Sequence, residues 1–179
     1  FASKFFGVGM TMAGIALGAV SFTVIGRMAT LVFAAVISAA SNLLYADLAT
    51  GGVWLDRFGH ASGFYWLAAN FGSDDRLSRL LLAITGENLA GGFAGAAFTA
   101  YLSSITSRSH AAVQFSLLAS LTFLVGSLGR AAIGAQIDAN GYAPVFFLTA
   151  ALGTIAVVLS ALEWARQARA ARLSPETPG

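Results

Sequence analysis

Cysteine is absent from the 179-residue sequence, which excludes disulfides, thiolate metal sites and cysteine nucleophiles. The two histidines, His60 and His110, lie far apart and outside the apolar runs, whereas a metal site needs several converging ligands. No Walker lysine follows the glycines at 91–95, and no G-x-S-x-G elbow occurs in the sequence. The sequence therefore predicts neither a metal nor another cofactor, and it does not indicate an enzyme.

Charged side chains are also scarce, since they make up 10% of the residues against roughly 25% in an average soluble domain. Hydrophobic residues make up 57%, and the mean hydropathy is +0.75. So few polar side chains cannot cover a water-soluble domain of this size. The ten basic residues are scattered, which disfavours nucleic acid as a partner. The composition indicates that the lipid bilayer is the partner of most outward-facing side chains.

Long apolar runs recur along the chain, and each can cross roughly 30 Å of hydrocarbon as a helix that rises about 1.5 Å per residue. We expect about five membrane-spanning helices within residues 1–165. Their ranges are about 4–25, 28–48, 77–104, 111–137 and 143–164. The fold class that follows is all-α, a polytopic transmembrane helix bundle.

The segment 53–71 differs from these runs because aromatic rings alternate with charged side chains in it. Aromatic rings mixed with charges are typical of the headgroup level of a membrane. A further crossing is disfavoured, because residues 59–69 alone are too few to span the bilayer. The sequence predicts a loop with a short interfacial segment. The residues concerned are Trp54, Phe58, Phe64, Tyr65 and Trp66, with Asp56, Arg57 and His60 between them.

The end of the chain, residues 166–179, carries Arg166, Arg169 and Arg172 and then a Ser-Pro-Glu-Thr-Pro stretch, so we expect a basic tail that becomes disordered. An inside tail would place the links at Arg27 and Arg108 on the inside as well. The basic residues divide evenly between the two sides, so the positive-inside rule permits this orientation without selecting it. Five spans and a first residue other than Met predict that one or more helices precede this sequence.

Polar residues within the apolar runs are the candidate functional groups. Glu87 lies about ten residues into the third run, roughly 15 Å deep by helical rise, where an ionisable group is costly in lipid. It is either hydrogen-bonded to a neighbouring helix or a proton-coupling or substrate-contacting acid. Asn88 and Gln114 either join helices or line a polar cavity. Arg130 is either a counter-ion, for Glu87 or for an anionic substrate, or a side chain that reaches the interface.

Glycines spaced four residues apart occur in two runs. Gly14 and Gly18 form one G-x-x-x-G pair, and Gly91 and Gly95 form another. Such pairs flatten one helix face and allow a neighbouring helix to approach closely, which matters in lipid because packing drives helix association there. We expect all four glycines to contribute to helix packing, with a bend at 91–95 as an alternative.

Several stretches resemble AmpG-type muropeptide permeases of the major facilitator superfamily. The sequence reads ENLAGGFAGAAF over residues 87–98, YLSS over 101–104 and AVQFSLL over 112–118, which is similar to the tenth and eleventh helices of that family. ISAASNLLY, over 37–45, resembles the ninth helix. Residues 134–147 resemble the turn between the eleventh and twelfth helices. The resemblance implies the C-terminal half of such a transporter, helices eight to twelve.

The same resemblance implies a multi-pass protein of the bacterial inner membrane with a cytoplasmic C-terminus, and an N-terminal half as its missing partner. In this family the tenth and eleventh helices help to line the central cavity, so Glu87, Asn88 and Gln114 become the cavity candidates. Two features depart from the family pattern. The link near Arg27 lacks a richer basic signature, and the segment 51–76 is long.

The function that we expect from the resemblance is proton-coupled import of anhydromuropeptides for cell-wall recycling, by alternating access around a midplane site. Its partners are then the small-molecule substrate and the proton. The same fold with another cargo, such as a siderophore or an acyl-CoA, is one alternative. A membrane scaffold or remnant that transports nothing is another.

Overall fold

The structure is a computed structural model that describes residues 2–107 and 110–173. Every secondary-structure element in these residues is a helix, which confirms the predicted all-α class for the described part of the chain. The helices are α1 (Ala2–Val24), α2 (Arg27–Ala49), α3 (Val53–Ala61), α4 (Phe64–Ala69), α5 (Asp75–Ile105), α6 (Ala111–Asn140) and α7 (Tyr142–Leu173).

Five of these helices, α1, α2, α5, α6 and α7, are long and apolar enough to cross a membrane. They correspond to the five predicted spans. The structure is therefore compatible with a multi-pass membrane protein. Most helix ends lie within three residues of the predicted ones, but α7 runs nine residues beyond residue 164. The arginines of the predicted tail thus belong to a helix, and only its last residues, 174–179, lie outside the described part.

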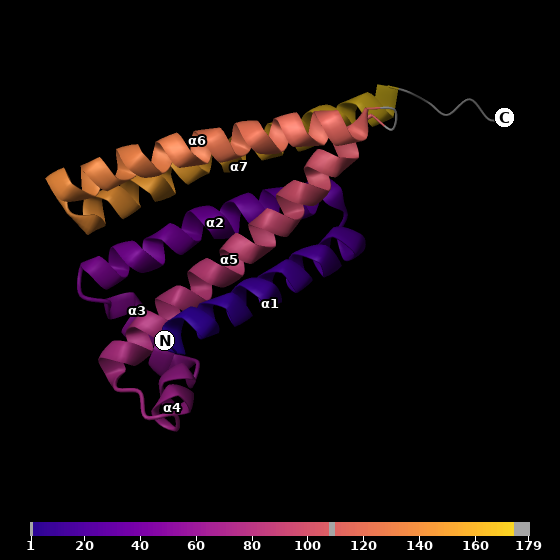
Figure 1. Cartoon of the computed structure of the whole chain (residues 1–179). Helices are drawn as coiled ribbons and strands as arrows, with labels where there is room; N and C mark the ends of the chain where they lie inside the picture. The colour runs from indigo at the N-terminus through magenta and orange to yellow at the C-terminus, as the bar shows by residue number, and fades with distance from the viewer. Residues whose placement is uncertain (1, 108–109, 174–179) are drawn as a thin grey trace.

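The segment 53–71 contains two short helices, α3 and α4, where a loop with a short interfacial segment is predicted. Nine residues of α3 span only about 13 Å at 1.5 Å per residue, far less than the hydrocarbon core of a bilayer. Figure 1 shows both helices folded back at the end of the bundle where α2 finishes and α5 begins. They lie beside the spans and do not form a sixth crossing.

The long helices run alternately in opposite directions (Figure 1). Short links join α1 to α2 and α6 to α7, whereas α3 and α4 lie between α2 and α5. The α1–α2 link and the C-terminal end of α7 lie at one end of the bundle. The α6–α7 link, α3 and α4 lie at the other. The α6–α7 link turns at Gly141, whose φ of 78° is favourable only for glycine. The link at Arg108 lies outside the described residues.

Helix α5 packs between α1 and α2, and α2 in turn packs between α5 and α7. The contact of α1 with α5 is close because glycines meet backbone there. A Cβ atom at Gly14 would meet the Leu89 carbonyl oxygen, and one at Gly18 would lie 2.9 Å from the Phe93 carbonyl oxygen. On α5 the close approach is at Gly92, where a Cβ atom would meet the Thr11 carbonyl oxygen.

Gly91 and Gly95 do not take part in this contact, since a Cβ atom at either position would meet nothing within 4 Å. Both residues are exposed, whereas Gly92 is buried against α1. In α5, Gly92 therefore makes the close contact with α1, and the predicted Gly91 and Gly95 do not.

Helix α6 is the least packed of the spans. Among the described elements it contacts only α5 and α7, and none of its residues is buried. Figure 1 shows it at the outer edge of the bundle, with its last turn next to the first turn of α7. Its sides are thus available to lipid or to further protein.

Candidate functional site

Glu87 pairs with a tyrosine from another helix. The Tyr45 hydroxyl of α2 donates a hydrogen bond of 2.7 Å to Glu87 Oε2 on α5. The Glu87 side chain is exposed within this chain. Tyr45 is four residues from the last residue of α2, and α5 runs obliquely to α2 in Figure 1. The carboxylate therefore lies closer to the α3–α4 end of the bundle than helical rise alone predicts.

An aromatic stack supports this pair from the side of α7. The Tyr45 ring stacks on Phe146, with ring centroids 5.2 Å apart and planes 21° from parallel. Phe146 stacks in turn on Tyr142, at 6.3 Å and 15°. Offset stacking favours one orientation of the Tyr45 ring. The hydroxyl is thus positioned by packing as well as by its hydrogen bond.

Further polar groups lie on the same face of α2, one and two turns before Tyr45. Asn42 accepts a 3.2 Å hydrogen bond from the Thr149 hydroxyl of α7 and donates one to the Ser38 carbonyl oxygen. A groove of about 500 Å³ runs between α2, α5 and α7 here. Its polar lining consists of Ser38, Asn42, Tyr101, Ser160 and Glu163.

Asn88, next to Glu87 in sequence, faces α1, whereas Glu87 is bonded to α2. Its Oδ1 accepts a 2.9 Å hydrogen bond from the Thr11 hydroxyl of α1, and its Nδ2 donates to the Ile84 carbonyl oxygen. Asn88 thus joins α1 to α5, which is the helix-joining alternative of the two expected from the sequence.

Gln114 and Arg130 lie away from Glu87 on α6. Gln114 Oε1 accepts a 2.7 Å hydrogen bond from the Ser107 backbone N–H, across the link between α5 and α6. Arg130 is exposed, and its Nε donates to the Gly126 carbonyl oxygen in its own helix. The four candidate residues therefore do not converge within the described part of this chain.

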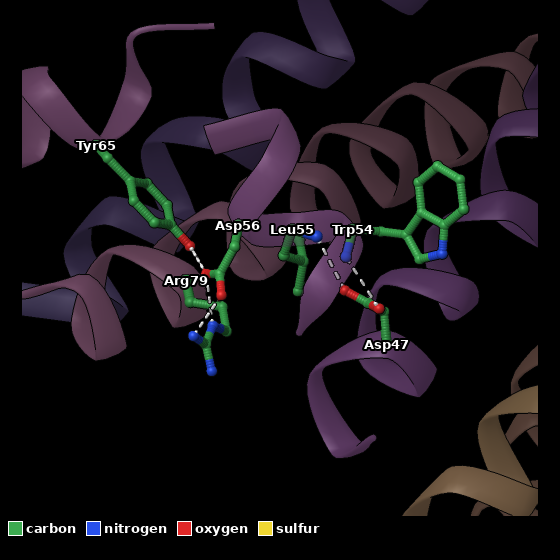
Figure 2. A network of polar contacts seen from close by, with 6 residues as sticks. All are labelled: Asp47, Trp54, Leu55, Asp56, Tyr65 and Arg79. Carbon is green, nitrogen blue, oxygen red and sulfur yellow. Dashed lines mark hydrogen bonds and ion pairs between the residues drawn. The ribbon is translucent and has the colours of Figure 1, made fainter. Parts of the chain in front are cut away.

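A second polar network fixes α3 and α4 to the end of the bundle (Figure 2). Arg79 of α5 binds Asp56 of α3 through two hydrogen bonds, Nε to Oδ1 at 2.8 Å and Nη2 to Oδ2 at 2.6 Å. The Tyr65 hydroxyl of α4 donates to Asp56 Oδ1 at 2.6 Å. One carboxylate thus connects three helices.

The surroundings of this network shift two of its pKa values. The hydrogen bonds from Arg79, and then from Tyr65, hold the pKa of the Asp56 carboxyl below its ordinary value of 3.8. Burial, and then the hydrogen bond to Asp56, raises the pKa of Tyr65 to about 12. Asp56 therefore stays ionised and Tyr65 neutral over the physiological range.

Asp47, at the end of α2, orients α3 from the other side (Figure 2). Its Oδ2 accepts from the Leu55 backbone N–H at 2.9 Å, and its Oδ1 accepts from that of Trp54 at 3.3 Å. These N–H groups in the first turn of α3 have no partner within their helix, and a carboxylate also complements the helix dipole. Asp47 thus replaces the missing side-chain cap at Gly52.

The opposite end of the bundle carries a network of its own. Arg27 at the start of α2 donates to Gln167 of α7 at 2.6 Å and to Ser104 of α5 at 3.2 Å. Glu163 accepts from Gln167 and from Arg166 within α7. Three spans are therefore connected by side chains at this end.

Sequence reasoning missed Tyr45 as the partner of Glu87 and Arg79 as the partner of Asp56. The partners are 42 and 23 residues apart in sequence, so no local spacing indicates either pair. Aromatic residues and arginines are also ordinary near helix ends in membranes. Within residues 2–107 and 110–173, no three histidine, aspartate or glutamate side chains gather closely enough to hold a metal ion.

Comparison of the chain with protein families, with curated proteins and with solved structures finds no match.

Proposed function

We propose that this chain is part of a secondary active transporter that couples substrate import to proton movement. The observation that carries the proposal is the carboxylate of Glu87, which stands exposed on a span and is held by Tyr45 of a neighbouring span. An ionised carboxylate facing lipid is costly, so protein or water must face this group in the working transporter. Intramembrane acids in such settings often mark proton and substrate pathways.

The Glu87–Tyr45 pair suits proton coupling chemically. The ionised carboxylate accepts the Tyr45 hydroxyl hydrogen bond, which offsets part of its desolvation. Protonation removes the charge and lets the carboxyl group donate instead. The neutral form tolerates a dry surrounding that the charged form does not. Loading a proton would thus permit closure around Glu87, and its release on the other side would reopen the site.

Helix α6 supports the presence of a second helical bundle. None of its residues is buried in this chain, and Arg130 is exposed on it. A charged residue on the surface of a span needs a polar or protein neighbour. In the proposed transporter, a second bundle packs against this side of the chain, and the two bundles rock around the site between them.

The proposed cargo is an anhydromuropeptide, and the proposed location is a bacterial inner membrane with the C-terminus in the cytoplasm. Both rest on the resemblance of residues 37–45, 87–98 and 112–118 to muropeptide permeases. A siderophore or an acyl-CoA is the alternative cargo for the same fold. Competition for binding to the purified transporter separates the two cargos. If the cargo is a muropeptide, excess muropeptide should displace bound muropeptide and excess siderophore should not.

The coupling role is tested by substrate-driven proton uptake into vesicles that contain the whole transporter. Glu87→Gln keeps the size of the side chain and removes its titration, so we expect proton uptake to fall to background. Tyr45→Phe removes only the hydroxyl and should reduce uptake partially. The matched control is Asp138→Asn, the same chemical change at an exposed carboxylate near the end of α6. Undiminished proton uptake in Glu87→Gln would refute the proposal.

A further inference from the structure

A large cavity beside the bundle has an apolar lining. It measures about 920 Å³ and lies between α2, α3, α5 and α7, and neither Glu87 nor Tyr45 lines it. Its volume is within the range of about 300–1,000 Å³ typical of small-molecule sites. Most of the lining is aliphatic or aromatic, including Leu43, Leu44, Phe58, Leu82, Leu89 and Phe147.

The carboxylate and the two hydroxyl groups in the lining already have partners within the chain. Asp47 accepts from the backbone N–H groups of Trp54 and Leu55. The Thr50 and Thr85 hydroxyls donate to carbonyl oxygens of their own or the preceding helical turn. A ligand inside the cavity therefore meets hydrocarbon contacts and little unsatisfied hydrogen-bonding capacity. The cavity suits an apolar occupant.

The rim of the cavity has the chemistry of a membrane interface. Trp54 and Phe58 of α3 border it, and their side chains are 72% and 63% exposed. The Arg57 guanidinium lies over the Trp54 ring, 5.9 Å from its centroid. Indole rings and arginines are enriched at the headgroup level of bilayers. Helix α3 lies where α2 ends and α5 begins, which is the level at which headgroups are expected (Figure 1).

Around this rim, both acidic side chains have partners, whereas one basic side chain forms no ion pair with a described residue. Asp56 is bound by Arg79, and the Asp47 carboxylate is engaged by the first turn of α3 (Figure 2). Arg57, in contrast, is exposed and forms no ion pair with any described residue. A guanidinium in this position can bind a phosphate through paired N–H groups.

We propose that this cavity binds one acyl chain of a membrane phospholipid, whose phosphate is held by Arg57 at the rim. The cavity extends from α3 to Leu43, which is six residues, or about 9 Å of helical rise, before the end of α2. It thus begins at headgroup level and continues to the depth of the acyl chains. A membrane phospholipid supplies an anion and hydrocarbon in this order, and it is always present beside the spans.

Native mass spectrometry of the full chain, purified and delipidated in detergent, tests this site. The probe is phosphatidylglycerol with two oleoyl chains, and the comparison ligand is the diacylglycerol with the same chains. We expect one tightly retained phosphatidylglycerol. Arg57→Ala should weaken its binding about tenfold, toward the affinity of the diacylglycerol, since a charge-assisted contact is lost. Arg76→Ala removes a charge at the same end of the bundle and should change nothing.

Filling the cavity should remove the binding of both ligands. Leu43→Trp places a large ring in the cavity, and Thr85→Leu is a milder filling variant in case the first does not fold, as judged by circular dichroism. Leu121→Trp, on the exposed surface of α6, is the control for added aromatic area. Unchanged lipid retention in a folded filling variant overturns the proposal. So does a dimer of the chain that the filling variant abolishes, because the occupant would then be a second copy.

Discussion

Close helix contacts in this chain depend on single glycines whose neighbours are backbone atoms. At Gly14 the Leu89 carbonyl oxygen occupies the space that a side chain would need, and at Gly92 the Thr11 carbonyl oxygen does. Backbone cannot move aside as a flexible side chain can. Gly14→Ala should therefore separate α1 from α5 and destabilise the fold by about 1–3 kcal/mol, as overpacking usually does.

Thermal unfolding in detergent, followed by circular dichroism, measures this loss. The matched control is Gly95→Ala, because a Cβ atom there meets nothing within 4 Å. The control should be neutral or slightly stabilising, since alanine favours a helix more than glycine does. Equal destabilisation by both variants would show that helix propensity, and not the α1–α5 contact, decides the stability.

The G-x-x-x-G spacing in α1 could be read from the sequence, because residues four apart share one helix face. The spacing in α5 was misleading. Gly91, Gly92 and Gly95 are all small, and only the rotation of α5 about its axis decides which of them meets α1. That rotation results from packing on both sides of the helix, so the sequence alone could not select Gly92. The sequence singled out Glu87 by its predicted depth, but it did not indicate Tyr45 as the partner of Glu87.

Helices α3 and α4 depend on a few polar contacts, because each is too short to be stable alone. The Asp56 pKa is lowered in the folded chain. Its ionised form therefore contributes stability above the ordinary value of 3.8, and this contribution is lost as the pH falls through the lowered pKa. We expect α3 and α4 to detach from α5 in acid before the spans unfold.

Hydrogen exchange across residues 53–74, measured at decreasing pH and corrected for the intrinsic exchange rate, follows this detachment. In Asp56→Asn, the backbone amides of this segment should exchange fast at neutral pH, and the acid transition should be absent. Asp75→Asn removes a nearby carboxylate outside the network and should keep that transition. In alkali, the stability that Tyr65 contributes is complete below its ordinary pKa of 10. It is lost as the pH rises through the raised pKa of about 12. An acid transition that persists in Asp56→Asn would assign it to another group.

Aromatic and charged residues in the segment 53–71 were enough to predict that it contains no sixth long helix. They were not enough to show two helices joined through Asp56 and Arg79. Long apolar runs, in contrast, predicted the five long helices with end errors of a few residues, except at the end of α7. That helix continues because Ala, Arg and Gln favour helix in water as well as in lipid.

At the scale of the whole molecule, the number of spans between two positions decides whether they lie on the same side of the membrane. Three long helices separate α4 from the end of α7, and one separates the α6–α7 link from it. The side of the membrane on which each position lies can be measured with introduced cysteines, because the chain contains no cysteine of its own. Single cysteines can be introduced at exposed alanines in each place: Ala69 in α4, Ala139 near the end of α6 and Ala171 near the end of α7.

Labelling of intact cells with a membrane-impermeant maleimide should then modify Ala69→Cys and Ala139→Cys but not Ala171→Cys, which should react only after the cells are opened. Leu121→Cys, in the middle of α6, is the control for a position shielded by lipid and should react slowly in both conditions. If Ala69→Cys and Ala171→Cys react from the same side, then one of α5, α6 and α7 does not cross the membrane. The reverse pattern, with only Ala171→Cys reactive in intact cells, would keep all three crossings and invert the proposed orientation.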